Sequence, residues 1–551
     1  MKNKYAILVI SSVLLSISGF AATQEPVEIF VEMENSSASA VPTSMLEESR
    51  GILSKNKVNV NVQALLNGSS VQVVANLKKM VVDPDAGEGF LMQLPGGTVV
   101  TLITNRVHSY LKGVETYSGR VKDIESGHFT LSIENGKVFG QVNIEFMAYD
   151  ISYDKGSKSH ILSEIDLAKV PKHSPEPLSD VTTYKAALEA LSFPTPLLSG
   201  SAIGTVRVLI LYGSDVSNAS TLASNIISEM NDTFFDDGMD PDLHVTLADL
   251  RNLNNDLDGV CKEDILEGME DADSPFTNIA TWVDDEDADV VLTIATTDPD
   301  VTNCSENGSY GRIGGQASAL LDSTKPYAVT MDTYAIGDLT AVHELGHVLG
   351  GGHPTWSVST LESFSDDVEP YSRGYIAGDG DWQTIMGAYD DNDCDFSTTL
   401  PNTDCVRLPL WSDPTKSYDS ETRGVTYTSD TQVPYSADMA AALEIQMPIA
   451  AVFESYPYSA PGTPSLDNVE KCFQHNIVEW NSVTNAENYQ VLYSFWSSFT
   501  NPEVIYFGSN TYLNVRVFPN STKYVKFRAC NGSGCGAYGS QLTLTYNSFC
   551  N

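Results

Sequence analysis

The stretch HELGHVLGGGH, residues 343–353, most narrowly constrains what this chain can fold into, because it holds three of the nine histidines. The surrounding apolar pattern predicts a helix, on which His343 and His347 are four residues apart and share one face. Val342 and Leu345 fall on the opposite face and can pack against a sheet. Both imidazoles can therefore point together into a cleft.

The glycines after this helix extend the pattern to a third histidine. Glycines at 350–352 permit backbone conformations with positive φ that end a helix abruptly, so His353 can turn back toward the first two histidines. Three neutral imidazoles leave one position of a tetrahedral zinc ion open for water, as in catalytic sites. Glu344 lies about 100° round the helix from His343, which suits a general base that acts on this water.

A structural zinc site and a chance match are the alternatives. A structural site is closed by a fourth cysteine or histidine, and none lies nearby in the sequence. With 9 histidines and 39 glycines in 551 residues, the full pattern arises by chance on the order of once in 10⁵ such chains. The sequence therefore favours a catalytic zinc site.

The pattern HExxHxxGxxH with a later methionine turn resembles the metzincin metallopeptidases, and among them the bacterial reprolysin-like (adamalysin-like) proteases. The resemblance covers roughly residues 205–455 and implies a zinc endopeptidase domain with a twisted mixed sheet and an active-site helix. It makes Met386, in TIMGAY, an apolar floor beneath the histidines. Other metzincins carry a zinc-side tyrosine two residues after this methionine, whereas Tyr389 is three residues after it. Tyr389 is left open as a transition-state donor or a packed aromatic.

The N-terminal part of the chain has a different composition. Residues 1–21 have basic, apolar and small-residue regions in the order of a secretory signal peptide. Residues 22–200 are β-rich, with a hairpin turn at Asn135-Gly136, and are expected to form a unit separate from the rest of the chain. Residues 80–165 resemble the propeptides of reprolysin-like proteases, which implies an inhibitory prosegment. This prosegment has no cysteine, so its latency must rest on another ligand or on steric cover.

Residues 201–456 alternate between predicted strands and helices, as an α/β layered domain does. Strands are expected at VRVLILY, LHVTLADL and ADVVLTIA, and helices in TLASNIISEMNDTFF and SADMAAALEIQMPIAAVFE. The glycine-rich YGRIGGQA at residues 310–317 is either a sheet edge that an extended substrate joins as a strand or a plain surface loop.

Residues 457–551 are predicted to form a small β-sandwich after a second proline-rich linker. WNSVTNAENYQVLY and the segment around FRACNGSGCGAYGS resemble a fibronectin type III module. The resemblance makes Trp480 the core tryptophan and Tyr524 the tyrosine whose hydroxyl bonds back to the chain. The predicted fold is therefore multidomain, with a β-rich prosegment, an α/β metzincin catalytic domain and an all-β sandwich.

All eight cysteines lie at or beyond Cys261 and are expected to form disulfides in an exported chain. They fall into two groups of four, and each group allows three pairings. We favour the close pairs Cys394 with Cys405 and Cys530 with Cys535, which leaves Cys261 with Cys304 and Cys472 with Cys550.

The charge of the chain limits its partners. Lys+Arg 31 against Asp+Glu 72 gives a net charge of -41, which repels nucleic acid and anionic membrane surfaces. After the signal peptide, no stretch is long and apolar enough to span a membrane. We expect a secreted, extracellular monomer that binds protein or peptide substrates and its own prosegment, but no nucleic acid. One catalytic zinc is the expected cofactor, and calcium binding at the acidic DDNDCD stretch is left open.

Three functions compete. The first is a secreted zinc endopeptidase made as a zymogen, with His343, His347 and His353 as ligands and Glu344 as base. The alternative is an adhesive or matrix-binding protein with a vestigial peptidase domain, against which the intact ligands and base count. An exopeptidase or another zinc hydrolase is the third, but such enzymes take a downstream glutamate as third ligand, whereas His353 is in place here.

Overall fold

The structure of the chain is a computed structural model. It describes residues 27–32, 40–41, 52–60, 81–82, 90–95, 97–167, 205–239, 241, 243–296, 314–354, 368, 371–378, 381–387, 406–426, 436–472, 475–517 and 521–547. The predicted signal peptide, the linker at 168–204, Tyr389 and the acidic DDNDCD stretch lie outside the described residues. No helix in the described part is long and apolar enough to cross a membrane.

The described residues of the N-terminal part form strands and turns, as predicted. Its strands are β1 (Val27–Glu32), β2 (Ala40–Val41), β3 (Ile52–Val60), β4 (Val81–Val82), β5 (Phe90–Gln93), β6 (Val99–Ser109), β7 (Val114–Val121), β8 (His128–Glu134), β9 (Lys137–Ile144), β10 (Met147–Asp154) and β11 (Ser159–Asp166). The order β6-β5-β1-β3-β11-β10-β9-β8-β7 closes on itself because β7 also pairs with β6. The turn between β8 and β9 is the predicted one, with φ of 50° at Asn135 and 73° at Gly136.

The middle of the chain forms an α/β unit around one sheet. Its strands are β12 (Thr205–Tyr212), β13 (His244–Asn252), β14 (Val290–Ala295), β15 (Gly315–Ala317) and β16 (Tyr327–Met331), and its helices are α4 (Ala219–Asp236), α5 (Lys262–Glu270), α6 (Ile279–Glu286), α7 (Thr340–Val348) and α8 (Met439–Ala450). The sheet order is β13-β12-β14-β16-β15, with β15 as an antiparallel edge strand. The strands and helices predicted here from VRVLILY to the last helix are confirmed.

Side chains along each strand alternate between the two faces of the sheet, and helices cover both faces. In β12, Val208 and Ile210 face the core shared with α4, α7 and α8. Leu209 and Leu211 face the core shared with α5 and the start of α6. Two small sheets lie before α8, formed by β17 (Trp382–Gln383) with β18 (Val406–Arg407) and by β19 (Asp413–Tyr418) with β20 (Glu421–Arg423).

The C-terminal part has two layers of strands. They are β21 (Leu466–Cys472), β22 (His475–Trp480), β23 (Asn488–Ser494), β24 (Glu503–Gly508), β25 (Tyr512–Arg516), β26 (Thr522–Asn531), β27 (Gly534–Cys535) and β28 (Leu542–Thr545). One layer is β21-β22-β25 with β4, and the other contains β24, β23, β26, β27 and β28. Trp480 is buried between them, as predicted, and its ring stacks on Phe527 at 5.2 Å.

The prediction for Tyr524 is wrong. Two other tyrosines bond back to the chain: the hydroxyl of Tyr506 accepts from the N–H of Asn510 at 2.8 Å, and that of Tyr489 accepts from the N–H of Val483 at 2.9 Å. Tyr506 is fully buried beside Trp480, whereas Tyr524 is only half-buried at the start of β26. Burial makes an intramolecular partner necessary for the first hydroxyl and not for the second.

Cys530 and Cys535 form a disulfide, as predicted. Cys261 is also disulfide-bonded, to a cysteine outside the described side chains. The other candidates lie outside the described side chains, so their pairing stays a prediction; they are Cys304, Cys394, Cys405, Cys472 and Cys550.

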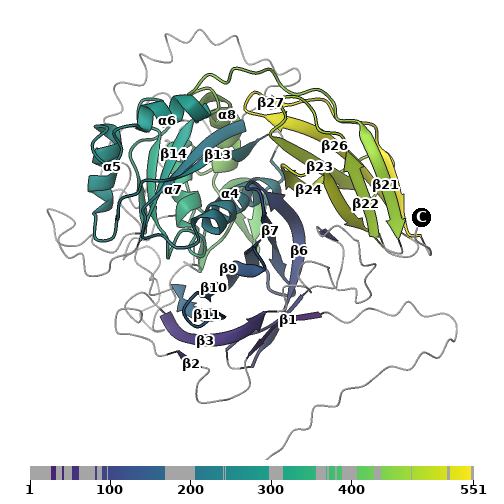
Figure 1. Cartoon of the computed structure of the whole chain (residues 1–551), viewed down its shortest axis with the longest axis horizontal. Helices are drawn as coiled ribbons and strands as arrows, with labels where there is room; N and C mark the ends of the chain where they lie inside the picture. The colour runs from purple at the N-terminus through teal and green to yellow at the C-terminus, as the bar shows by residue number, and fades with distance from the viewer. Residues whose placement is uncertain are drawn as a thin grey trace, which may run out of the picture.

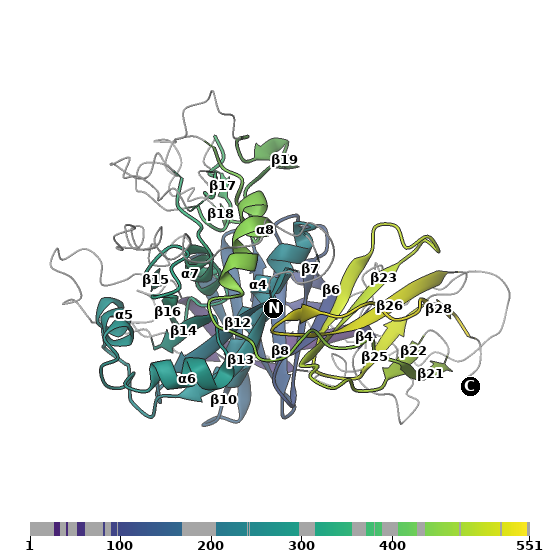
Figure 2. The ribbon, with the colours of Figure 1, turned by 90° about the horizontal axis from the view of Figure 1, so that it is seen from above.

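The N-terminal part is in direct contact with both other parts of the chain. Strand β6 pairs in parallel with β24, so N-terminal and C-terminal strands belong to one 15-stranded sheet. Helix α4 of the central unit packs against β7, β8 and β9. Figure 1 shows the three parts of the chain meeting near α4, and Figure 2 shows β6 between that helix and the C-terminal strands.

Candidate metal centre

Helix α7 places the first two histidines on a buried element. Val342 and Leu345 pack into the core shared with α4 and α8, as their spacing predicts. His343 and His347 lie one turn apart, and their rings are 4.7 Å apart. The two side chains are buried and lie on the face that the sequence assigns to them.

The turn after α7 brings in His353. Gly350 has φ of 94°, which favours glycine, and its N–H donates to the carbonyl of His347. Gly351 does not have positive φ, contrary to our expectation for all three glycines. It is needed for space, because a Cβ there would lie 2.7 Å from Cε of Met439 and 2.9 Å from the carbonyl oxygen of Gly346.

The three histidines converge on one point. Nε2 of His343 and Nε2 of His347 each lie 3.1 Å from Nε2 of His353. All three side chains are buried, and their ligand atoms lie within 4.8 Å of one another. Three candidate metal ligands from one helix and the turn after it therefore lie together.

Hydrogen bonds to backbone carbonyls set the tautomers. Nδ1 of His343 donates to the carbonyl of Ile385 at 2.7 Å, and Nδ1 of His347 donates to the carbonyl of Gly351 at 2.7 Å. A carbonyl oxygen only accepts, so both Nδ1 atoms carry the proton and both Nε2 atoms carry a lone pair. The carbonyl of His353 accepts from Nη1 of Arg373 at 3.1 Å, which anchors the third histidine.

This donor set fits a zinc ion. If Nε2 of His353 carries a proton, it can donate that proton to only one of the other two Nε2 atoms. At least one pair of nitrogen lone pairs then faces each other at short distance unless a cation lies between the three rings. A tetrahedral zinc ion with Zn–N distances of about 2.0–2.1 Å places neighbouring nitrogens about 3.3 Å apart. The observed separations of 3.1 Å are close to that value.

Met386 packs beneath the metal-binding helix. It is fully buried, and a Cβ at Gly346, between the two helical histidines, would lie 2.5 Å from its sulfur. Met386 therefore lies against the helix that carries the two histidines, and its role as an apolar floor beneath them stays a prediction. The preceding residue, Ile385, supplies the carbonyl that orients His343, so the methionine turn also supports the metal centre through its backbone.

Glu344 is buried beside the edge strand of the sheet, with 2% of its surface exposed. A Cβ at Gly315 in β15 would lie 2.6 Å from Cγ of Glu344 and 2.8 Å from Cγ2 of Thr340. Of the stretch 310–317, residues 314–317 are described; residues 315–317 form the sheet edge, and Gly315 lies against the candidate base. The sequence left this stretch open between an edge and a loop.

Lys262 is a charged neighbour that the sequence analysis missed. It is buried at the start of α5, and its ammonium interacts electrostatically with Glu263 and Glu344. Burial lowers the pKa of Lys262 to about 8, against the opposing effect of these carboxylates. Nothing in the local sequence around Lys262 indicates that it lies near residue 344.

A second group of potential ligands, His244 with Cys530 and Cys535, does not form a metal site. The two sulfurs are joined in a disulfide, so neither is a thiolate. His244 instead faces the hydroxyl of Thr205 at 3.0 Å.

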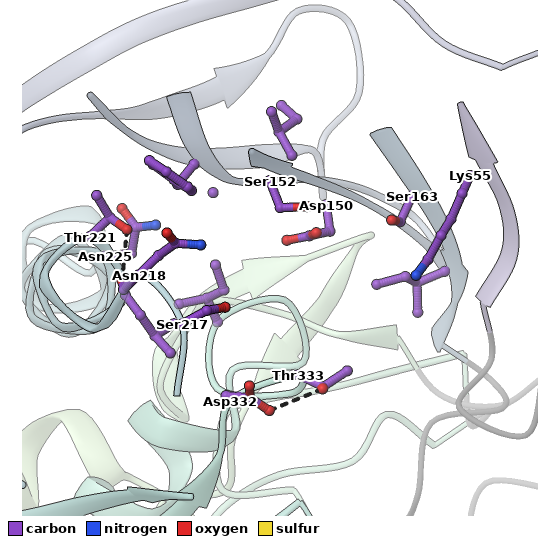
Figure 3. A pocket seen from close by; sticks show the side chains of 16 residues that line it. Lys55, Asp150, Ser152, Ser163, Ser217, Asn218, Thr221, Asn225, Asp332 and Thr333 are labelled. Carbon is purple, nitrogen blue, oxygen red and sulfur yellow. Dashed lines mark hydrogen bonds between the residues drawn. The ribbon is translucent and has the colours of Figure 1, made fainter. Parts of the chain in front are cut away.

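A polar cavity of about 340 Å³ lies between the N-terminal strands and the central unit, and no metal-centre histidine lines it. Figure 3 shows Asp150 and Asp332 on opposite walls, with Lys55 at one side. Burial raises the pKa of Asp150 to about 7; the charge of Lys55 opposes this shift and the carboxylate of Asp332 adds to it.

Comparisons with known proteins give distant relatives. No family model matches the chain. Among solved structures, metalloproteinase-II from Bacteroides fragilis aligns at 12% identity with a TM-score of 0.28, covering 50% of this chain and 82% of that one. An Fn3-like protein from Clostridium thermocellum aligns at 20% identity with a TM-score of 0.15, covering 16% of this chain and 98% of that one.

Two curated relatives share a name. A peptidyl-Asp metalloendopeptidase of Stenotrophomonas maltophilia (strain R551-3) is 24% identical over 284 residues, which is 50% of this chain and 60% of that protein. A peptidyl-Asp metalloendopeptidase of Xanthomonas campestris pv. campestris is 24% identical over 289 residues, which is 50% of this chain and 59% of that protein. The matches span less than two thirds of the relatives' length. The relatives support a metallopeptidase.

Proposed function

We propose that the chain is a secreted zinc-dependent endopeptidase of the metzincin type, made as a zymogen with a C-terminal module of the fibronectin type III kind. The observation that carries this proposal is the convergence of three histidine Nε2 atoms beside the buried Glu344. The distant relatives named metalloendopeptidase support the same function.

The residues of the centre divide the chemical work. His343 and His347 would hold the metal through Nε2, and their Nδ1–H bonds to carbonyls keep each ring in one orientation. A zinc ion held there would supply an acidified water and would polarise the scissile carbonyl. Glu344 takes a proton from the attacking water on a carboxylate oxygen and delivers it to the nitrogen of the leaving amine. Its packing against Gly315 keeps the carboxylate in place for both transfers.

Strand β15 offers a docking edge for the substrate. It pairs only with β16 in the described sheet, so its other edge can accept an extended peptide as a further strand. Gly315 touches Glu344, so a peptide on this edge passes beside the base. The geometry suits an endopeptidase because the edge does not require a free chain terminus.

We further propose a preference for peptide bonds next to aspartate, the specificity that the names of the two relatives describe. Lys262 is the residue that we assign to the substrate carboxylate, since it is a buried cation within electrostatic range of Glu344. The variant Lys262→Met is expected to lower kcat/KM for an aspartate peptide at least about tenfold relative to the matched asparagine peptide. An unchanged ratio between the two peptides would remove Lys262 from this role.

The zymogen proposal rests on how the N-terminal strands cover the elements that build the centre. Arg106 forms ion pairs with Asp232 and Asp236 of α4, the first at 3.2 Å and the second at 2.6 Å. The side chain of Gln141 fills the space at Gly337, in the loop that leads into α7. We propose that this cover, without a cysteine, keeps the prosegment in place and the enzyme latent.

The test compares the wild-type chain with Glu344→Gln after the same processing. Both are expected to bind one zinc ion per chain, but only the wild type is expected to hydrolyse casein, since glutamine keeps the shape and cannot take the proton. The control His353→Ala is expected to lose zinc. Full activity of Glu344→Gln would refute the mechanism. A wild-type chain that binds zinc but cleaves no protein at any pH would favour the vestigial, adhesive alternative.

A further inference from the structure

Strand β6 of the prosegment joins the C-terminal module as an additional strand. It pairs in parallel with β24, with Val107 opposite Tyr506, His108 opposite Phe507 and Ser109 opposite Gly508. The N–H of Ser509, just beyond β24, donates to the carbonyl of Ser109 at 2.9 Å. The edge of the module is therefore satisfied by backbone groups of the prosegment.

Gly508 makes this close approach feasible. A Cβ at this position would lie 2.7 Å from both the backbone nitrogen and the carbonyl oxygen of Ser109, and 2.9 Å from the hydroxyl of Tyr506. Backbone atoms in a paired strand cannot move aside as a flexible side chain can. The absence of a side chain at Gly508 thus matches the presence of β6.

The module is held on the central unit by contacts that do not involve the prosegment. Arg207 of β12 pairs with Glu487 at 2.5 Å, and the amide of Asn488 donates to the hydroxyl of Thr246 at 2.9 Å. The ring of His244 in β13 lies 4.5 Å from that of Phe507. The module can therefore stay in place whether or not β6 is bound.

A buried hydrogen-bond chain holds the other side of β6. The hydroxyl of Tyr110 accepts from the amide of Asn231 at 2.7 Å and forms a second hydrogen bond with Nδ1 of His108 at 3.0 Å. Nε2 of His108 then donates to Asp232 at 3.1 Å. Strand β6 thus contacts α4 on one side and β24 on the other, as Figure 1 shows.

We propose that the C-terminal module forms part of the docking site for the prosegment. A chain cut between Leu167 and Thr205 keeps its prosegment bound, and the prosegment leaves only when β24 releases β6. The module then acts in latency, in addition to any surface that it binds. This inference rests on the zymogen proposed above, since it describes how the cut prosegment is retained.

The experiment places a recognition sequence for a site-specific protease between Leu167 and Thr205 of the full-length Glu344→Gln chain, which prevents self-cleavage. After cutting, the two fragments are separated by size-exclusion chromatography, and the dissociation rate is measured. The prosegment is expected to co-elute with the rest of the chain. Gly508→Ala is expected to raise the dissociation rate at least about tenfold, because the added methyl group wedges β24 from β6.

The matched control is Gly462→Ala in the same module. A Cβ there meets only Cγ1 of Val483, at 3.8 Å, so the control is expected to retain the prosegment as the parent does. Equal retention by the two alanine variants, or immediate release from the parent on cutting, would overturn the proposal. The readout needs no catalysis, so a proteolytically inactive wild type would refute the proposed function alone.

Hydrogen exchange keeps the test informative if Gly508→Ala fails to fold. The side chain of Ser509 is exposed, and its N–H is bonded to the carbonyl of Ser109. In the cut parent chain this amide is expected to remain as protected as in the uncut chain. Fast exchange at Ser509, with the amides of α4 still protected, would show that β24 does not hold the prosegment.

Discussion

The contact between Gly315 and Glu344 allows the base to be displaced without touching a metal ligand. In Gly315→Ala, the new Cβ would lie 2.6 Å from Cγ of Glu344, whereas ordinary contacts begin at 3.4 Å. The glutamate must therefore move by 3.4 minus 2.6, or 0.8 Å, if β15 stays in place. A displacement of about 1 Å in a catalytic group costs about 100-fold in rate. We expect kcat/KM on a fluorogenic peptide to fall about that much, with zinc content unchanged.

Gly314→Ala is the control for this prediction. Its Cβ would lie 3.0 Å from Oγ1 of Thr340 and 3.3 Å from Cβ of Tyr334, and Glu344 is not among its nearest neighbours. We expect it to retain most of the wild-type activity. The reasoning is refuted if Gly315→Ala keeps near-wild-type kcat/KM at full zinc content, or if both alanine variants lose activity equally.

Three further predictions concern stability. Burial raises the pKa of Asp150 from 3.8 to about 7, so the docked prosegment holds a proton that the free prosegment releases. We therefore expect docking to weaken as the pH rises from 3.8 to about 7 and to stay constant above that range. Asp150→Asn should flatten this pH dependence in the cut-chain dissociation assay. Arg423→Met removes the guanidinium that lies 2.7 Å from the buried carboxylate of Asp237, and should lower the free energy of unfolding in urea by about 3–5 kcal/mol. An unchanged free energy of unfolding would show that this ion pair does not stabilise the fold. Removing the metal should lower the free energy of unfolding by about 4 kcal/mol relative to free zinc at about 1,000 times Kd, and an unchanged melting curve would contradict the histidine site.

Local patterns predicted the elements that carry the metal centre. The spacing of His343, His347 and their apolar neighbours describes α7 because a helix is stabilised by contacts within a few residues along the chain. The glycine turn was predictable in the same way, although only Gly350 has positive φ. Space next to Met439, which no local pattern reveals, explains Gly351.

Contacts between distant residues could not be predicted. The sequence leaves Gly315 open between a loop and a sheet edge, and only the folded sheet shows that it packs against Glu344. Lys262, which interacts with Glu344, lies far from both residues in the sequence. The pairing of β6 with β24 also joins residues that are distant in the sequence. It could not be predicted because the sequence of an edge strand does not specify which other strand it pairs with. The prediction for Tyr524 failed for a related reason. Only the packed sandwich shows that the hydroxyl of Tyr506 is buried and bonds back to the chain.

The central claim is that His343, His347 and His353 hold one zinc ion with a position left open for water. X-ray absorption at the zinc edge of the purified chain tests it most directly. We expect three imidazole nitrogens at about 2.0–2.1 Å and one light oxygen ligand, and no bound zinc in His353→Ala. Sulfur scattering at about 2.3 Å, or four nitrogen ligands, would mean a closed structural site and would contradict the claim.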